Sequence, residues 1–142
     1  MKTLRIFLIS TLLLAPIRVW CAEAANGWQV QAEQAMELIR KNRLEEARRI
    51  SDQFYPLVPD RGLSRQAYVL LITVLGVTDQ EDLVAYLKRA MKAEPNNADH
   101  PFNLAVVCAT TGKPDIATAR IAYARALALG SERDEVFEKL IK

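Results

Sequence analysis

The amino-acid sequence predicts an all-α fold, in which short antiparallel helix hairpins stack into an α-solenoid. Apolar residues recur at helical spacing, and no stretch keeps the apolar–polar alternation that is typical of a strand. Proline, glycine and asparagine residues separate the helical segments at short intervals. A spacing of about 36 residues relates Pro59 to Pro95 and Ala90-Met91 to Ala126-Leu127, which indicates a repeated helix–turn–helix unit.

Residues 1–24 are expected to be a secretory signal peptide. Lys2 and Arg5 precede an apolar run from Ile6 to Ile17, and Ala22-Glu23-Ala24 supplies the small residues needed for cleavage after Ala24. The run is shorter than the roughly 20 residues that cross a bilayer, so no membrane span is expected after cleavage. The helical repeat domain would then occupy residues 25–142, and the protein would be periplasmic or secreted.

Cys21 is not expected to carry a lipid anchor, because bulky Val19 and Trp20 precede it where lipidation requires small residues. Removal of the signal peptide would leave 16 basic and 16 acidic residues, since three of the 19 Lys and Arg and one of the 17 Asp and Glu lie within it. A domain without net charge has no broad attraction for nucleic acid, so no nucleic-acid partner is expected. Cys108 would be the single remaining cysteine, without an intramolecular disulfide partner.

The first hairpin is expected to comprise helices over residues 28–41 and 44–55. Pro56, Pro59 and Gly62 then interrupt the helical pattern.

The second hairpin is expected to comprise helices over residues 63–75 and 80–93, separated by a break at residues 76–79. The acidic run at residues 79–82 stands where the second of these helices begins, and a favourable interaction with the helix dipole accounts for it. Pro95-Asn96-Asn97 ends the unit.

The third hairpin is expected over residues 98–111 and 114–129, because Gly112 can end one helix and Pro114 can open the next. A last helix over residues 132–141 would begin at Ser131 as N-cap, with Asp134 three residues on. We expect one apolar stripe of this helix to cover the open end of the stack. The stripe consists of Val136, Phe137, Leu140 and Ile141.

The order of large and small residues resembles the tetratricopeptide repeat, a helix–turn–helix unit of about 34 residues. The last repeat fits the family pattern best, at Leu104, Ala105, Gly112, Ala119, Tyr123, Ala126 and Leu127. The first repeat fits at Ala35, Leu38, Ala47 and Pro59, with Asn42 in place of the turn glycine. The middle repeat fits at Leu70, Val74, Leu87, Ala90 and Pro95, but large residues, Leu71 and Leu83, occupy two of its small positions. The small residues are expected to let helix backbones approach closely.

The resemblance implies a concave surface, lined by the first helix of each repeat, that holds an extended peptide or a partner helix. Register with the family suggests ten groove residues: Gln29, Met36, Arg40, Arg65, Tyr68, Ile72, Asp99, Phe102, Val106 and Thr110. Arg40 and Arg65 could bind a carboxylate of the partner. For Ile72 and Val106, burial in the core is an equal alternative.

The sequence indicates no enzymatic activity, cofactor or metal. Its one histidine, His100, and Cys108 lie on the same expected helix, about 12 Å apart at 1.5 Å per residue, too far for a nucleophile–base pair. The five glycines are scattered and form no phosphate-binding loop.

We therefore expect an exported, non-enzymatic scaffold or adaptor that binds a protein partner in the bacterial envelope and assists assembly of a pilus or secretion apparatus. An alternative comes from the stretch from Pro101 to Ala105, which, with Gly112 and the following alanines, resembles the last repeat of type III secretion translocator chaperones. Those proteins hold a secretion substrate in the groove, but they are cytoplasmic and lack a signal peptide. A regulatory subunit of an enzyme and a homodimer formed through apolar ends also remain open.

Overall fold

The computed structural model describes residues 27–142, and these residues are all-helical, without a strand. The expected signal peptide and Cys21 lie outside them. A first helix covers residues 27–40. It is followed by α2 (Leu44–Phe54), a short 3₁₀ helix η1 (Tyr55–Leu57), α3 (Arg65–Thr78), α4 (Gln80–Ala93), α5 (Asp99–Thr110), α6 (Ile116–Ala128) and α7 (Glu135–Leu140). The helices expected from the sequence are all present, and that over residues 80–93 has the expected bounds.

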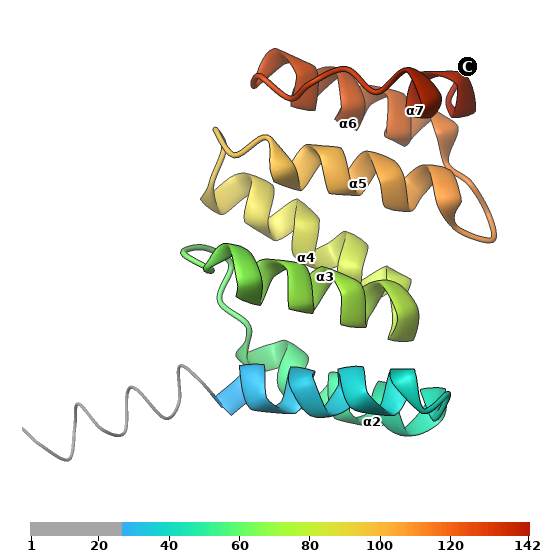
Figure 1. The fold of residues 1–142 in the computed structure, drawn as a ribbon. Helices are drawn as coiled ribbons and strands as arrows, with labels where there is room; N and C mark the ends of the chain where they lie inside the picture. Colours follow the sequence, from blue (N-terminus) through green and yellow to red (C-terminus); the bar gives the residue numbers. More distant parts are fainter. Residues whose placement is uncertain (1–26) are drawn as a thin grey trace, which may run out of the picture.

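Successive helices pack against one another, and they follow each other along the molecule in chain order (Figure 1). The contacts join α2 to α3, α3 to α4, α4 to α5 and α5 to α6. Within the described residues, no helix is both long and apolar enough to cross a membrane.

Aromatic rings pack against one another at both ends of the core. At the N-terminal end, the Trp28 ring packs on Phe54, with ring centroids 6.3 Å apart. At the C-terminal end, Phe102, Tyr123 and Phe137 form an aromatic cluster with centroid distances from 5.1 to 6.3 Å. Burial of these rings ties each terminal helix to the rest of the domain.

Asn42 lies in the turn between the first helix and α2. Its φ of 56° lies in the left-handed region, where asparagine is tolerated better than other residues that carry a Cβ. The amide of Arg43 donates to the carbonyl oxygen of Leu38 at 2.9 Å, which closes the end of the first helix. Asn42 thus adopts the conformation that a glycine would take at this position.

Buried alanines lie on both α5 and α6, which pack against each other. Ala105, Ala119 and Ala126 are fully buried, as expected from the sequence. α5 and α6 can pack closely because the side chain at each of these three positions is only a methyl group. Gly130, with a φ of 98°, ends α6, and the following amide, that of Ser131, donates to the carbonyl oxygen of Ala126 at 3.0 Å.

The last helix is shorter than expected, and its N-cap is Asp134 rather than Ser131. The Asp134 carboxylate accepts hydrogen bonds from the amides of Val136 and Phe137, at 3.0 and 2.9 Å. Phe137 is buried, whereas Val136 is 79% exposed. The expected stripe is therefore split. Phe137 and Ile141 lie four residues apart on one face and are buried, whereas Val136 and Leu140 lie four residues apart on the neighbouring face and are exposed.

Candidate functional site

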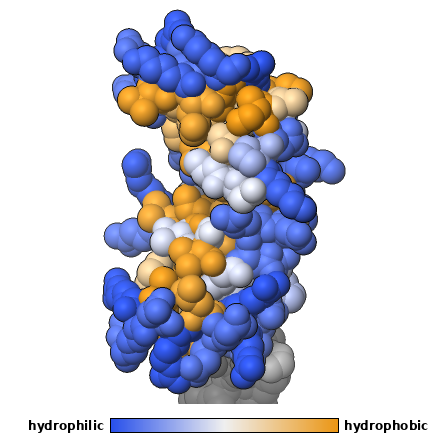
Figure 2. Space-filling model, turned by 90° about the vertical axis from the view of Figure 1, so that its right-hand side faces the viewer, coloured by the Kyte–Doolittle hydropathy of each residue, from blue (hydrophilic) through white to orange (hydrophobic). Residues whose placement is uncertain are grey.

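A hollow of about 240 Å³ lies between α3 and α5. It is formed by residues 72–76 of α3, residues 103–110 of α5 and the beginning of α4, and the carboxyl-terminal ends of α3 and α5 point to the right in Figure 1. Figure 2 views this side of the molecule and shows a band of hydrophobic surface at mid-height, with a hydrophilic surface over the N-terminal hairpin. The lining residues are Ile72, Thr73, Gly76, Gln80, Leu83, Asn103, Val106, Val107 and Thr110.

Three of the ten groove residues suggested by the sequence line this hollow. Ile72 comes from α3, and Val106 and Thr110 come from α5. Ile72 and Val106 are half-buried and also pack against the core. Each of them therefore has one part in the core and one part in the wall of the hollow. The structure thus brings together side chains that are more than 30 residues apart in the sequence.

Two of the ten lie in core contacts instead. Tyr68 is only 8% exposed. Phe102 is half-buried between Tyr123 and Phe137, beneath α7. Both side chains hold helices together, so substituting them would test folding as well as binding.

The other five lie away from the hollow. Arg65 and Asp99 are exposed at the amino-terminal ends of α3 and α5. Arg40 is exposed on the first helix, and its Nη1 lies 3.5 Å from a carboxylate oxygen of Glu37. On the same helix, Gln29 and Met36 are half-buried. Since no arginine lines the hollow, carboxylate binding by Arg40 or Arg65 would take place elsewhere on the surface.

A buried polar network stands behind the hollow and joins α3 to α5. The Nδ1 of His100 lies 3.2 Å from the Tyr68 hydroxyl, and its Nε2 lies 2.9 Å from a carboxylate oxygen of Glu94. The Asn103 amide donates to the same hydroxyl at 3.1 Å. Every member is satisfied if the Tyr68 hydroxyl donates to Nδ1 and Nε2 donates to Glu94, which assigns the proton of the imidazole to Nε2.

The surroundings of the network shift the pKa values of Glu94 and Tyr68 in opposite directions. The hydrogen bond from His100 lowers the pKa of the Glu94 carboxyl, and a further bond from the Gly62 amide acts in the same direction. Burial raises the pKa of the Tyr68 hydroxyl well above its ordinary value. A carboxylate and a neutral phenol thus lie at opposite ends of the imidazole, and both ring nitrogens of His100 are engaged in structural contacts.

The walls of the hollow offer hydrogen-bond acceptors. Thr73 and Thr110 each donate the hydroxyl hydrogen to the carbonyl oxygen four residues earlier, at 2.7 and 2.8 Å. Asn103 donates its amide hydrogens to the Asp99 carbonyl oxygen and to the Tyr68 hydroxyl, at 2.8 and 3.1 Å. All the side-chain hydrogens of Thr73, Asn103 and Thr110 are therefore engaged, and these side chains can only accept further hydrogen bonds through their oxygen lone pairs.

Sequence reasoning missed Thr73 and Asn103, each one residue from a suggested groove position. On α3 the exposed stripe consists of Gln66, Val69, Thr73 and Val77, one residue further along than the suggested Arg65, Tyr68 and Ile72. One residue corresponds to a rotation of about 100° around a helix. Gln66 and Thr73, two polar residues seven positions apart in a mostly apolar helix, are the local signal that could have placed the stripe.

Three carboxylates outside the hollow come close together. Those of Asp52, Asp79 and Asp82 lie within 4.8 Å of one another. Asp79 is the N-cap of α4, where it accepts from two backbone amides, and Arg48 donates to it at 3.0 Å. Burial, followed by the nearby Asp79 carboxylate, raises the pKa of Asp82. The acidic run thus has the helix-starting role expected from the sequence, and its charge is balanced in part by Arg48.

In comparisons with known proteins, no family model, curated protein or solved structure matches the chain significantly. The resemblance to tetratricopeptide repeats therefore remains a prediction from the sequence.

Proposed function

We propose that this protein is a non-enzymatic, exported scaffold or adaptor that binds a segment of a protein partner between α3 and α5. The observation that carries the proposal is the convergence of Ile72, Val106 and Thr110, suggested from the sequence as groove residues, on one hollow. The consecutive packing of the helices supports an arrangement as three tetratricopeptide-like hairpins followed by a capping helix. In the bacterial envelope, such a protein would assist assembly of a pilus or secretion apparatus.

The chemistry of the walls defines the segment that this hollow accepts. No charged side chain lines it, and Ile72, Leu83 and Val106 supply apolar surface. The oxygens of Thr73, Asn103 and Thr110 accept hydrogen bonds but have no hydrogen left to donate. We therefore expect an uncharged segment with aliphatic side chains, because no lysine or arginine lines the hollow to pair with a carboxylate. Its backbone N–H groups would donate to these three oxygens, and the side-chain amide of Gln80, which also lines the hollow, could donate to a backbone carbonyl oxygen of the segment.

The groove is tested by crosslinking in cells. A photoreactive amino acid at exposed Thr110 is expected to capture one partner, and mass spectrometry of the product gives the crosslinked segment. Thr73→Arg should abolish the crosslink, because it fills the hollow from a position on the exposed stripe. Gln66→Arg is the matched control, since Gln66 is exposed on the same helix but does not line the hollow. A synthetic peptide of the captured segment should bind the purified protein, and a crosslink unaffected by Thr73→Arg would contradict the groove.

Export is tested separately by the intact mass of the protein after fractionation of its native cells. A periplasmic species beginning at Ala25 is expected. A full-length cytoplasmic species would instead favour the secretion-chaperone alternative, in which the groove holds a secretion substrate. A membrane-bound species beginning at Cys21 with added lipid mass would show that the protein is anchored.

A further inference from the structure

A second hollow, of about 490 Å³, is formed by the carboxyl-terminal half of α4 together with α5 and α6. Both α4 and α6 pack against α5, which lies between them. No residue lines both this α4–α6 hollow and the α3–α5 hollow, so the two are separate surfaces. The lining residues are Lys88, Met91, Lys92, Pro95, Leu104 and Arg125.

The α4–α6 hollow combines cations with recessed apolar surface. Lys88, Lys92 and Arg125 are exposed. Met91 is half-buried and Leu104 is only 4% exposed, so these two side chains lie deeper than the charged groups. No aspartate or glutamate lines the hollow. An apolar group that entered it would therefore be surrounded by positive charge.

Neighbouring carboxylates do not neutralise these three cations. Within residues 27–142, none of the three takes part in an ion pair. Asp115 is the carboxylate that interacts with Lys88, but it does not line the hollow, and it accepts hydrogen bonds from the Thr118 amide and hydroxyl at 3.0 and 2.6 Å. Those bonds and, to a smaller extent, the charge of Lys88 lower the pKa of Asp115. Asp115 thus offsets part of the charge of Lys88 from outside the hollow.

The other acidic groups near the ends of α4 and α6 are engaged or lie elsewhere. The Glu94 carboxylate, just after α4, binds His100. Glu132, which follows α6, does not line the hollow. Lys92 and Arg125 stand in the last turns of their helices, where each helix end carries roughly half a negative charge. Three cations outweigh two such helix ends, so the hollow keeps a positive potential.

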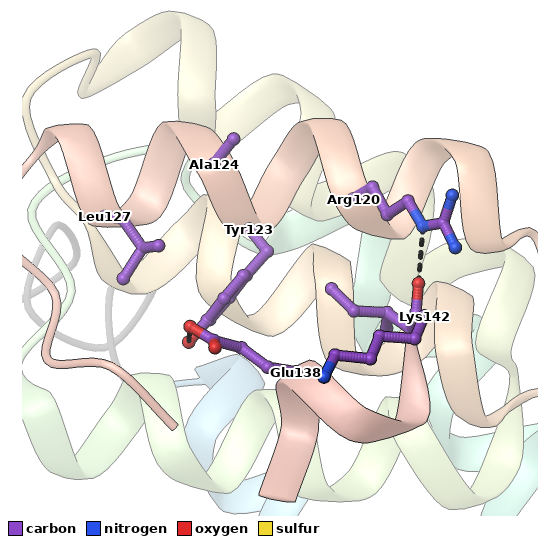
Figure 3. Close-up of a pocket in the computed structure, with 7 residues that line it drawn as sticks. Arg120, Tyr123, Ala124, Leu127, Glu138 and Lys142 are labelled. Atoms are coloured by element: carbon purple, nitrogen blue, oxygen red, sulfur yellow. Dashed lines mark hydrogen bonds between the residues drawn. The ribbon is translucent and has the colours of Figure 1, made fainter. Parts of the chain in front are cut away.

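The hollow between α6 and α7 has a different charge pattern (Figure 3). Arg120 and Lys142 line it together with Glu138, so both signs of charge are present. Arg120 Nε also donates a hydrogen bond to the carbonyl oxygen of Ile141, which the dashed line in Figure 3 marks. Cations elsewhere on this helix are therefore engaged within the protein, whereas those of the α4–α6 hollow are directed to a ligand from outside.

We propose that the α4–α6 hollow binds an acidic segment of a protein partner, in which an apolar side chain is flanked by aspartate or glutamate residues. The apolar side chain would contact Met91 and Leu104, and the flanking carboxylates would pair with the three cations. The Arg125 guanidinium can hold a carboxylate through two parallel hydrogen bonds, and the two lysines act as point charges. Since the two hollows are separate, one molecule could hold an uncharged segment and an acidic segment at once.

A membrane surface fits this hollow less well. Proteins that bind at the bilayer surface insert apolar side chains that project beyond the cationic groups. In the α4–α6 hollow Met91 and Leu104 lie deeper than the cations, so they are accessible to a side chain that enters but not to a flat surface.

The test is the binding of two short fluorescent peptides to the purified protein, in the processed form that cells produce, followed by fluorescence anisotropy. One peptide has a leucine between pairs of glutamates, and the other has the same leucine between pairs of lysines. We expect the glutamate peptide to bind with an affinity that falls as salt is added, and the lysine peptide not to bind. A glutamate peptide with serine in place of leucine should bind more weakly, because it leaves the apolar surface unfilled.

Charge reversal tests where the peptide binds. Lys92→Glu and Arg125→Glu should each raise the dissociation constant of the glutamate peptide about fivefold or more. The chain that carries both of these and Lys88→Glu should instead bind the lysine peptide, a gain that a folding defect cannot produce. Arg65→Glu is the charge-matched control, since exposed Arg65 begins α3 and lies outside the hollow. Thr73→Arg, which fills the α3–α5 hollow, should leave binding of the glutamate peptide unchanged and so separates this proposal from the proposed function.

Circular dichroism verifies that each variant keeps its helices. A glutamate peptide that does not bind, that binds no better than the lysine peptide, or that is insensitive to the charge reversals would overturn the proposal. Cosedimentation with vesicles that contain phosphatidylglycerol tests the membrane. Vesicle binding that the charge reversals abolish, without binding of the glutamate peptide, would assign the hollow to a lipid surface and would also overturn the proposal.

Discussion

The helix pairs α3–α4 and α5–α6, which we propose to be the middle and last hairpins, pack with side chains of different size. In the middle hairpin Leu71 and Leu83 are buried, Leu83 lies close to Gly76 of α3, and α3 and α4 pack less closely against each other than α5 and α6. In the last hairpin Ala105, Ala119 and Ala126 are fully buried, and α5 and α6 pack closely against each other. Side-chain volume at a few positions thus sets the distance between helices of similar length.

This difference also bears on the candidate site. Leu83, which stands where a tetratricopeptide-like hairpin would have a small residue, contributes to the wall of the α3–α5 hollow. The position where the sequence departs most from the tetratricopeptide pattern that it resembles thus lies at the surface that we propose to bind a partner. The closely packed α5 supplies the opposite wall.

The largest expected effect is at the interface of the middle hairpin. Leu71→Ala removes a fully buried side chain and should lower the free energy of unfolding by about 2–5 kcal/mol, because it leaves a cavity. Urea unfolding followed by circular dichroism measures this change. Leu57→Ala, the same substitution at a leucine that is 59% exposed, is the control. Equal losses at the two positions would show that Leu71 does not fill an interface between helices.

The opposite change applies to the last hairpin. Ala126→Leu should lower the free energy of unfolding by about 1–3 kcal/mol, because a fully buried alanine has no room for a larger side chain. Ala85→Leu, at an exposed position of α4, controls for the change in helix propensity. Thermal unfolding of the two variants gives the comparison. An Ala126→Leu protein as stable as the control would mean that α5 and α6 can move apart without cost.

The connection between α3 and α4 depends on one residue, Asp79, which caps both helix ends. Asp79→Ala removes the acceptor for the Glu81 and Asp82 amides and should cost about 1 kcal/mol of stability. Asp79→Asn keeps a capping oxygen and should cost less, although it loses the charge that faces Arg48. Urea unfolding distinguishes the two variants, and an order reversed between them would contradict the capping role.

A smaller, pH-dependent effect is expected where the two hairpins meet, at the Glu94–His100 contact. The folded-state pKa of Glu94 lies below its ordinary value of 4.5, so the ionised contact stabilises the fold above about pH 4.5 and its contribution is lost as the pH falls below that value. Glu94→Gln should therefore lower stability by less than about 1 kcal/mol at neutral pH, because Glu94 is partly exposed, and the difference should vanish in acid. Unfolding curves at pH 7 and in acid test this, and a difference that grows in acid would contradict it.

The positions of the helices were predictable because local chemistry determines them. Proline and asparagine after α4 and the acidic start of α4 are short-range signals, and the structure confirms the expected bounds of that helix. The cap of α7 was less certain from sequence because Ser131 and Asp134 can both serve. Gly130 and Ser131 still take part in ending α6, so α7 begins at the later residue.

The groove was only partly predictable, because its register depends on contacts between repeats. Tyr68 turns inward since its hydroxyl finds His100 and Asn103, which lie 32 and 35 residues further along the chain. No local pattern in α3 contains that information. In α5, Val106 and Thr110 line the hollow, whereas Phe102 packs between Tyr123 and Phe137 and Asp99 lies at the amino-terminal end of the helix.

The single residue between α3 and α4 has a consequence for how this chain tolerates changes in length. An insertion next to Asp79 would rotate α4 by about 100° relative to α3 and would carry Leu83 and Leu87 out of the core. Residues 111–115, which connect α5 to α6, include the exposed Gly112, Lys113 and Pro114. Insertions should be accepted there, so this connection is the place to attach a reporter peptide or a fluorescent label without disturbing the helices.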